Sequence, residues 1–195
     1  MNPRAVVCIA VLIGSGCAQK PPPNLYVISA TPEAASRTWS HAEPVVAVTR
    51  ARLPEYLERS QLVSRNGANA LVLDDDNHWG EPLSDSVPRV LAENLSHYLP
   101  SARVVLPEDA RGQKVPYEYV VALDAYEPDG TGNVVMRGHW VLRDIHTGTV
   151  VSEGDIDERR PLESPKASDA VAGMNETLND ASRQIAEASV GKLGR

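Results

Sequence analysis

The spacing of apolar residues predicts two amphipathic helices. Across 84–98, apolar side chains recur at intervals of three and four positions, which places them along one face of a helix. Ser84 or Asp85 is expected to cap the start of this helix, and Pro100 to end it. A second stripe with the same spacing predicts a helix over 168–190.

The region before the first helix predicts strands. A nearly continuous apolar run at 45–48 is typical of a strand that is buried on both faces. Asn66-Gly67 separates two short apolar segments, 62–63 and 71–73, and both residues tolerate the positive φ that a type I′ hairpin turn requires. The acidic stretch 74–81, DDDNHWGE, is expected to form a solvated loop, because His78 interrupts the alternating oxygen ligands of a calcium loop.

From residue 117 the pattern changes to alternation of apolar and polar positions. It predicts three long antiparallel strands with one buried face, joined by turns at 128–130 and 146–148. A further short strand is expected within 102–107. Together these elements predict an α/β fold of the α+β type, with a single mixed, largely antiparallel sheet and two helices packed on one face.

The first residues read as an export signal. Arg4 precedes an apolar run that ends at Gly14 and is too short for a transmembrane helix of about 20 residues. It fits the hydrophobic region of a secretory signal. Two small residues then precede Cys17, which resembles a bacterial lipobox, although Gly14 stands where leucine is usual. The resemblance implies cleavage before Cys17 and acylation of its thiol and new amino group.

The alternative for Cys17 is a buried or disulfide-bonded cysteine. Cys8, the second cysteine of the chain, lies inside the signal, so the exported protein retains no disulfide partner within the chain. Ala18 follows Cys17, whereas an aspartate there would retain a lipoprotein at the inner membrane. The resemblance therefore implies a lipid anchor on the periplasmic face of the outer membrane, firmly held by several acyl chains.

Three regions follow from these signals. Residues 1–16 form the signal peptide, 17–40 the acylated cysteine with a proline-rich tether, and 41–195 the folded domain. The tether is expected to be extended because AQKPPPN is polar and rich in proline. A proline-rich recognition motif is the alternative for this segment. Without residues 1–16, the chain has 18 basic and 26 acidic side chains and a formal net charge of −8, which argues against nucleic-acid binding.

The sequence offers little chemistry. It contains no phosphate-binding loop, no G-x-S-x-G elbow, no H-E-x-x-H and no C-x-x-C. Asp75, His139 and Ser152 are the residue types of a hydrolytic triad, but nothing in the sequence places them together. We therefore expect a protein that is not an enzyme and that holds no cofactor and no metal.

Two motifs carry a family resemblance. LPEYLERSQ precedes the hairpin, and HWGEPL leads into the first predicted helix. With the lipobox, Tyr26 and VLRDIHTG, they extend over nearly the whole mature chain. The chain resembles the PqiC-type ABC-transport auxiliary lipoproteins, with Gly80 where that family more often has alanine. The matching positions are Leu53, Pro54, Tyr56, Leu57, Arg59, Gln61, Trp79, Glu81, Pro82, Leu83 and Arg89.

This resemblance implies a function that the residues alone do not. It implies an adaptor at the outer membrane for an MCE-domain periplasmic protein, which works with an inner-membrane ABC transporter to move lipids between the membranes. We expect the two motifs to form adjacent surface loops, stiffened by proline and carrying interface-prone aromatic residues. The candidate partner-binding residues are Leu53, Pro54, Tyr56, Trp79, Glu81 and Pro82.

Alternatives remain open at this stage. Tyr56 and Trp79 could instead be core residues that hold a loop against the helix. The protein could be a periplasmic lipid-binding carrier, although a chain with no phenylalanine and 5% aromatic residues can line a large apolar cavity only with difficulty. A homo-oligomer built through the edge of the strand meander or the last helix is compatible with the adaptor function.

Overall fold

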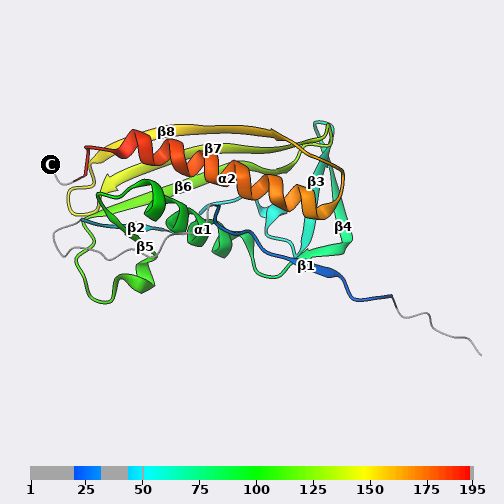
Figure 1. Cartoon of the computed structure of the whole chain (residues 1–195), viewed down its shortest axis with the longest axis horizontal. Coiled ribbons are helices and arrows are strands. Elements are labelled where there is room, and N and C mark those ends of the chain that lie inside the picture. Colours follow the sequence, from blue (N-terminus) through cyan, green and yellow to red (C-terminus); the bar gives the residue numbers. More distant parts are fainter. Residues whose placement is uncertain (1–19, 32–43, 50, 194–195) are drawn as a thin grey trace, which may run out of the picture.

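The computed structural model describes residues 20–31, 44–49 and 51–193 (Figure 1). Cys17 and Ala18 lie outside these ranges. None of the helices in the described ranges is long and apolar enough to cross a membrane. The elements in chain order are β1 (Asn24–Tyr26), β2 (Val45–Val48), η1 (Glu55–Leu57), β3 (Gln61–Asn66), β4 (Ala70–Trp79), α1 (Leu83–Tyr98), β5 (Arg103–Val105), η2 (Pro107–Ala110), β6 (Tyr117–Pro128), β7 (Asn133–Asp144), β8 (Val150–Pro161) and α2 (Ala167–Ser189).

The larger sheet has five strands in the order β5-β2-β6-β7-β8. The predicted meander β6-β7-β8 is antiparallel, and β2 pairs in parallel with both β5 and β6. The strand β2 therefore lies inside the sheet with a neighbour on each side, which agrees with its nearly continuous apolar sequence. Both helices cover the same face of this sheet (Figure 1), so the predicted α+β class with two helices on one face is confirmed.

The structure contains two sheets, whereas the sequence predicted a single one. A second sheet of three strands, in the order β1-β4-β3, lies at one end of the molecule (Figure 1). The predicted hairpin is confirmed, with β3 and β4 as its arms, but the predicted type I′ turn is wrong. Asn66 ends β3 opposite Ala70, the turn is formed by residues 67–69, and of the Asn66-Gly67 pair Gly67 alone has a positive φ, +72°. The hairpin signal in the sequence predicts only the pairing of β3 with β4. It gives no sign that β1 pairs with the other edge of β4.

The loop predicted at 74–81 is wrong over 74–79. These residues complete β4, with Asn77, His78 and Trp79 paired to β1 and His78 also facing β3. Backbone hydrogen bonds to two neighbours support a strand that has few apolar side chains. The charge of the acidic run is partly offset, since Lys20 Nζ lies 2.9 Å from Asp76 Oδ1.

Part of the segment expected as a tether belongs to the fold. Residues 24–26 form β1, and Ile28 beyond it is fully buried in the core. The Gly80 N–H donates to the Tyr26 carbonyl over 2.7 Å, which joins this segment to the end of β4. The ordered structure therefore includes chain well before the predicted domain start at residue 41.

Two local details position the functional residues. Helix α1 begins at Leu83 after Pro82, so Ser84 and Asp85 lie within its first turn and are not the cap that the sequence suggested. Strand β6 has an irregular register between Leu123 and Ala125. After this bulge the inward and outward positions change phase, and Glu127 is fully buried near the end of the strand.

Candidate functional site

The structure brings the two family motifs together. The Trp79 N–H donates to the Ser60 carbonyl over 2.6 Å, and Gln61 pairs with His78 where β3 begins and β4 ends. The Ser84 hydroxyl in the first turn of α1 donates to the Glu58 carboxylate over 2.9 Å. The two motifs are therefore neighbours, but they are not the pair of surface loops that the sequence predicted, since LPEYL contains η1 and HWGEP begins with the buried end of β4.

A proline begins each of the two helical segments at this site. Pro54 precedes η1 and accepts the Leu57 N–H through its carbonyl, and Pro82 precedes α1 and accepts the N–H groups of Asp85 and Ser86. Proline at a helix start needs no hydrogen bond from its own nitrogen and fixes its φ. Both motifs therefore enter their helices with a restricted backbone.

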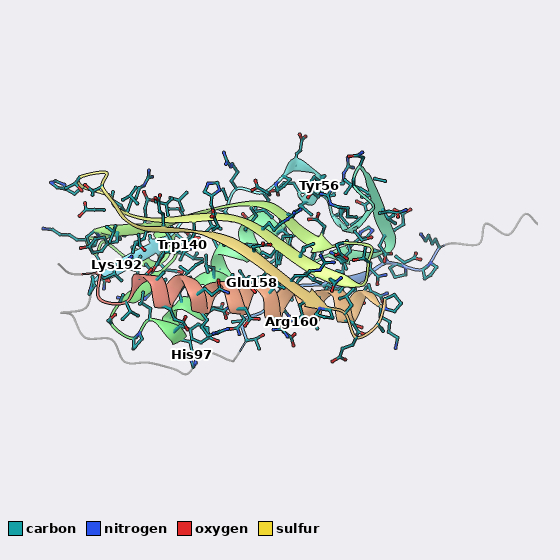
Figure 2. The ribbon with its side chains drawn as sticks, turned by 90° about the horizontal axis from the view of Figure 1, so that it is seen from above. Tyr56, His97, Trp140, Glu158, Arg160 and Lys192 are labelled. Atoms are coloured by element: carbon teal, nitrogen blue, oxygen red, sulfur yellow. The ribbon has the colours of Figure 1, made fainter. Side chains whose placement is uncertain are left out.

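Tyr56 is half-buried and connects η1 to both sheets. Its hydroxyl lies 3.1 Å from each carboxylate oxygen of Glu127, to which it donates. Arg65 of β3 donates from Nε to Glu127 over 2.9 Å and from Nη2 to the Tyr56 oxygen over 2.9 Å. The guanidinium also lies over the Tyr56 ring, 5.5 Å from its centre. Figure 2 shows Tyr56 well apart from α2.

Electrostatics favour the protonated forms of Tyr56 and Arg65. Burial raises the pKa of the Tyr56 phenol, and the neighbouring Glu127 carboxylate raises it further, so the phenol remains a donor. The hydrogen bond to Glu127 raises the pKa of the Arg65 guanidinium. Glu127 itself is fully buried. It also accepts the Tyr126 N–H over 2.6 Å, so its charge is matched by three donors.

Glu81 contributes to a second polar contact, at the start of α1. Its carboxylate pairs with Arg89, which also lies 3.5 Å from Glu93 and 3.4 Å from the Ile28 carbonyl oxygen. Arg89 therefore connects the turn after β4 to the N-terminal segment. Because Glu81 is already occupied within the chain, its main role in the structure is to position this turn.

The remaining candidate residues divide between core and surface. Trp79 is 8% exposed and packs in the hydrophobic core. Leu53 is half-buried, while Pro82 is exposed. Leu53 also lines a shallow hollow of about 390 Å³ with Ala51, Arg52, Glu58 and Ser84. The alanine of the family would fit at Gly80 only with a small shift, since an added Cβ would lie 3.3 Å from a Val27 methyl group.

Sequence reasoning missed Arg65 and Glu127. Neither residue belongs to the positions that match the family, and neither was considered as a candidate. The one available signal was a carboxylate next to Pro128 at the end of a tyrosine-rich strand. Its burial depends on the bulge in β6, which the alternating pattern does not reveal.

The imagined hydrolytic triad is not assembled. Asp75 lies on β4, in the other sheet from His139 and Ser152. His139 is exposed on β7, whereas Ser152 is buried on β8 and donates to the Ala188 carbonyl over 3.1 Å. Among the residues that the structure describes, no three His, Cys, Asp or Glu side chains gather as a metal site requires.

The comparison with known families is decisive at this point. The family of ABC-type transport auxiliary lipoprotein components matches residues 26–186. The chain belongs to this family. The match begins at β1 and ends in α2, so it contains both motifs and the Tyr56–Arg65–Glu127 triad.

Relatives and solved structures agree with this assignment. The chain is 24% identical over 147 residues to the intermembrane transport lipoprotein PqiC of Escherichia coli K12, covering 75% of this chain and 76% of the relative, and equally to that of Shigella flexneri. A crystal structure of an uncharacterized protein has a TM-score of 0.72 at 18% identity, covering 86% of this chain and 98% of that one. Protein XCC0632 of Xanthomonas campestris has a TM-score of 0.64 at 13% identity, with coverages of 88% and 94%. These structures share the fold.

Proposed function

We propose that this auxiliary transport lipoprotein is a non-catalytic adaptor. Acylated Cys17 would anchor it to the periplasmic face of the outer membrane, where it docks an MCE-domain periplasmic protein of an inner-membrane ABC transporter that moves lipids between the membranes. Membership in a family of auxiliary lipoproteins supports this function, as does the likeness to proteins named for intermembrane transport.

The structural observation that carries the proposal is the fixed geometry of η1. Tyr56 holds the LPEYL segment to β3 and β6 through Arg65 and Glu127, over distances of 2.9 to 3.1 Å. A surface segment that is ordered before binding loses less conformational entropy when a partner docks. We place the docking surface on η1 and the start of α1, with Leu53, Pro54, Tyr56 and Pro82 as its contact residues.

A mild-detergent pull-down of the acylated protein from cell envelopes tests the proposal. Co-purifying proteins and bound lipids are both identified by mass spectrometry. An MCE-domain protein recovered without stoichiometric lipid supports the adaptor function. Lipid recovered without any protein partner contradicts it and favours the carrier function.

A charge reversal locates the docking surface within the same experiment. Arg59 is exposed beside Glu55 and Tyr56, so Arg59→Glu changes the surface of the LPEYL motif with little effect on the core. We expect this variant to recover less MCE-domain protein. Lys114→Glu, an equal charge change in the exposed loop before β6, is the matched control and should recover the wild-type amount. An equal loss of recovered MCE-domain protein in both variants would show that the docking surface lies elsewhere.

A further inference from the structure

An apolar cavity of about 450 Å³ opens beside the second sheet. Its wall is formed by β3 and β4, by the turn between β6 and β7, and by the segment that leads into α2. The volume lies within the range of small-ligand sites, roughly 300 to 1,000 Å³. The apolar side chains of the wall are Leu62, Val63, Trp79, Pro128, Leu162, Pro165, Ala167, Ala170 and Met174.

Two polar side chains of the wall already have partners in the protein. The Asp74 carboxylate accepts the Asp76 N–H over 3.0 Å and the Asn77 amide over 2.8 Å. The Ser164 hydroxyl donates to Asp169 over 2.5 Å. The polar lining also includes Ser64 and the exposed Glu163. Among the described residues, no lysine, arginine or histidine lines the cavity, so an anionic group would find no counter-charge here, whereas an alkyl chain needs none.

The first described residue lies beside a strand of the cavity wall. Lys20 is paired with Asp76, which is two positions along β4 from Asp74 in the wall, or roughly 7 Å. Cys17, which the predicted lipobox acylates, precedes Lys20 by three residues. The described chain therefore begins near the wall of the cavity, a short stretch after the predicted acyl anchor.

We propose that this cavity binds one acyl chain. Its source is either the protein's own anchor or a lipid of the adjoining membrane, because both supply the same alkyl group. Trp79 of the HWGEPL motif ends β4 and forms part of the wall against which the acyl chain packs. The proposal does not depend on docking of an MCE-domain protein and is measured without one.

Quenching of tryptophan fluorescence by a dibrominated stearic acid tests the proposal, because bromine quenches indole only at close range. The probe is titrated into the otherwise full-length Cys17→Ala protein, and we expect saturable quenching. Trp79→Phe should lower this saturable quenching, since Trp39 and Trp140 still fluoresce, whereas Trp140→Phe, which changes a tryptophan packed against Gly154 of β8, should retain it.

A matched pair of variants, each with one alanine replaced by phenylalanine, tests whether the ligand binds in this cavity. Ala167, the half-exposed first residue of α2, lines the cavity, and Ala167→Phe should weaken binding at least about tenfold, or ~1.4 kcal/mol. Ala188→Phe adds the same ring on an exposed face near the other end of α2 and should bind as the parent does. Thermal unfolding verifies that both variants fold. Absence of saturable quenching, or equal quenching in the Ala167→Phe protein, would overturn the proposal.

The acylated protein distinguishes the two sources. If its own chain fills the cavity, the acylated protein should resist quenching by added brominated acid. If a membrane lipid enters, the acylated protein should instead be quenched in vesicles of brominated phosphatidylethanolamine. Because these readouts involve only lipid, their failure is separate from a failed pull-down of an MCE-domain protein.

Discussion

The hydroxyl of Tyr56 lies 3.1 Å from both carboxylate oxygens of Glu127, a residue 71 positions later in the chain and fully buried. This contact joins a short helical turn on the surface to the end of β6 in the larger sheet. Arg65 supplies the positive charge that makes the buried carboxylate tolerable. The shape of the LPEYL surface therefore depends on residues outside the motif.

Removing the cation should destabilise the protein more than removing the acid. Arg65→Met leaves Glu127 buried without a positive partner, and we expect the free energy of unfolding to fall by about 3 kcal/mol. Glu127→Gln leaves Arg65, which is 26% exposed, with access to water, and should cost about 1 kcal/mol. Denaturant unfolding of the purified variants provides the measurement.

The control for this comparison is an exposed pair. Arg183 lies 3.7 Å from Glu187 on α2, and Arg183→Met should change stability by less than about 1 kcal/mol. The double variant of Arg65→Met with Glu127→Gln should recover part of the single loss, because no buried charge remains unpaired. A double variant less stable than the sum of the two single effects would contradict a buried ion pair.

Gly130 and Gly148 form a second matched pair. Both adopt left-handed backbone in turns of the meander, with φ of +73° and +72°. A Cβ at Gly130 would lie 2.1 Å from the Arg65 carbonyl oxygen, whereas nothing lies within 4 Å of one at Gly148. Gly148→Ala should cost about 1 kcal/mol for the backbone alone. Gly130→Ala should cost roughly 2 kcal/mol more because β3 must shift, and thermal unfolding measures both. Equal costs would show that the turn does not pack tightly against β3.

The elements that the sequence predicted well are those with local signals. The hairpin is predicted by Asn66-Gly67 between two apolar segments, and α1 and α2 are predicted by a stripe of apolar residues. The site was harder to predict because it depends on contacts between distant segments. Arg65 and Glu127 are 62 positions apart, and β1 pairs with β4 in parallel across more than fifty residues.

The bulge in β6 shows why alternation alone was insufficient. Before it, Tyr119, Val121 and Leu123 follow the predicted inward positions. After it, Tyr126 and Glu127 are both buried although they are neighbours, because Tyr126 packs toward α2, where it donates to the Met174 carbonyl, and Glu127 faces Arg65 of β3. Gly138 on β7 allows β6 and β7 to lie close together next to the bulge, since a Cβ there would lie 2.2 Å from the Ala122 carbonyl oxygen. Such a change of phase has no signature in the strand's own sequence.

Two buried tyrosines should make the protein sensitive to alkali. Burial raises the pKa of Tyr119 to about 12 from its ordinary 10, and burial also raises the pKa of Tyr126. Between pH 10 and 12 the unfolded chain loses protons that the folded protein keeps, so stability that is complete below pH 10 declines across this window. Denaturant unfolding at pH 9 and pH 11, with tyrosinate absorbance, measures the effect.

Tyr119→Phe is the control for the alkaline effect. It removes one titrating group from the core, so the fall in stability between pH 9 and pH 11 should become smaller. Tyr98→Phe, which removes a half-buried hydroxyl that donates to Asn179, shows at pH 9 what the loss of a tyrosine hydroxyl costs. Ionisation of Tyr119 near pH 10 in protein that remains folded would contradict its burial.

Cys17 should decide whether the protein is membrane-bound. Cys17→Ala removes the thiol that the predicted lipobox acylates, and we expect the variant in the soluble periplasmic fraction, whereas Cys8→Ala should remain with the envelope. Retention of the Cys17→Ala protein in the membrane fraction would contradict lipid anchoring.

Ala18 should decide which membrane holds the anchored protein. Ala18→Asp introduces the residue that retains lipoproteins at the inner membrane, so the variant should move to inner-membrane fractions of a density gradient, while Ala18→Ser should stay with the outer membrane. Relocation would also separate the two proposed activities. Displaced protein should lose contact with the far end of an MCE conduit but keep its acyl-chain cavity, because the cavity wall lies entirely within the folded domain. An unchanged position of the Ala18→Asp protein would contradict sorting by this residue.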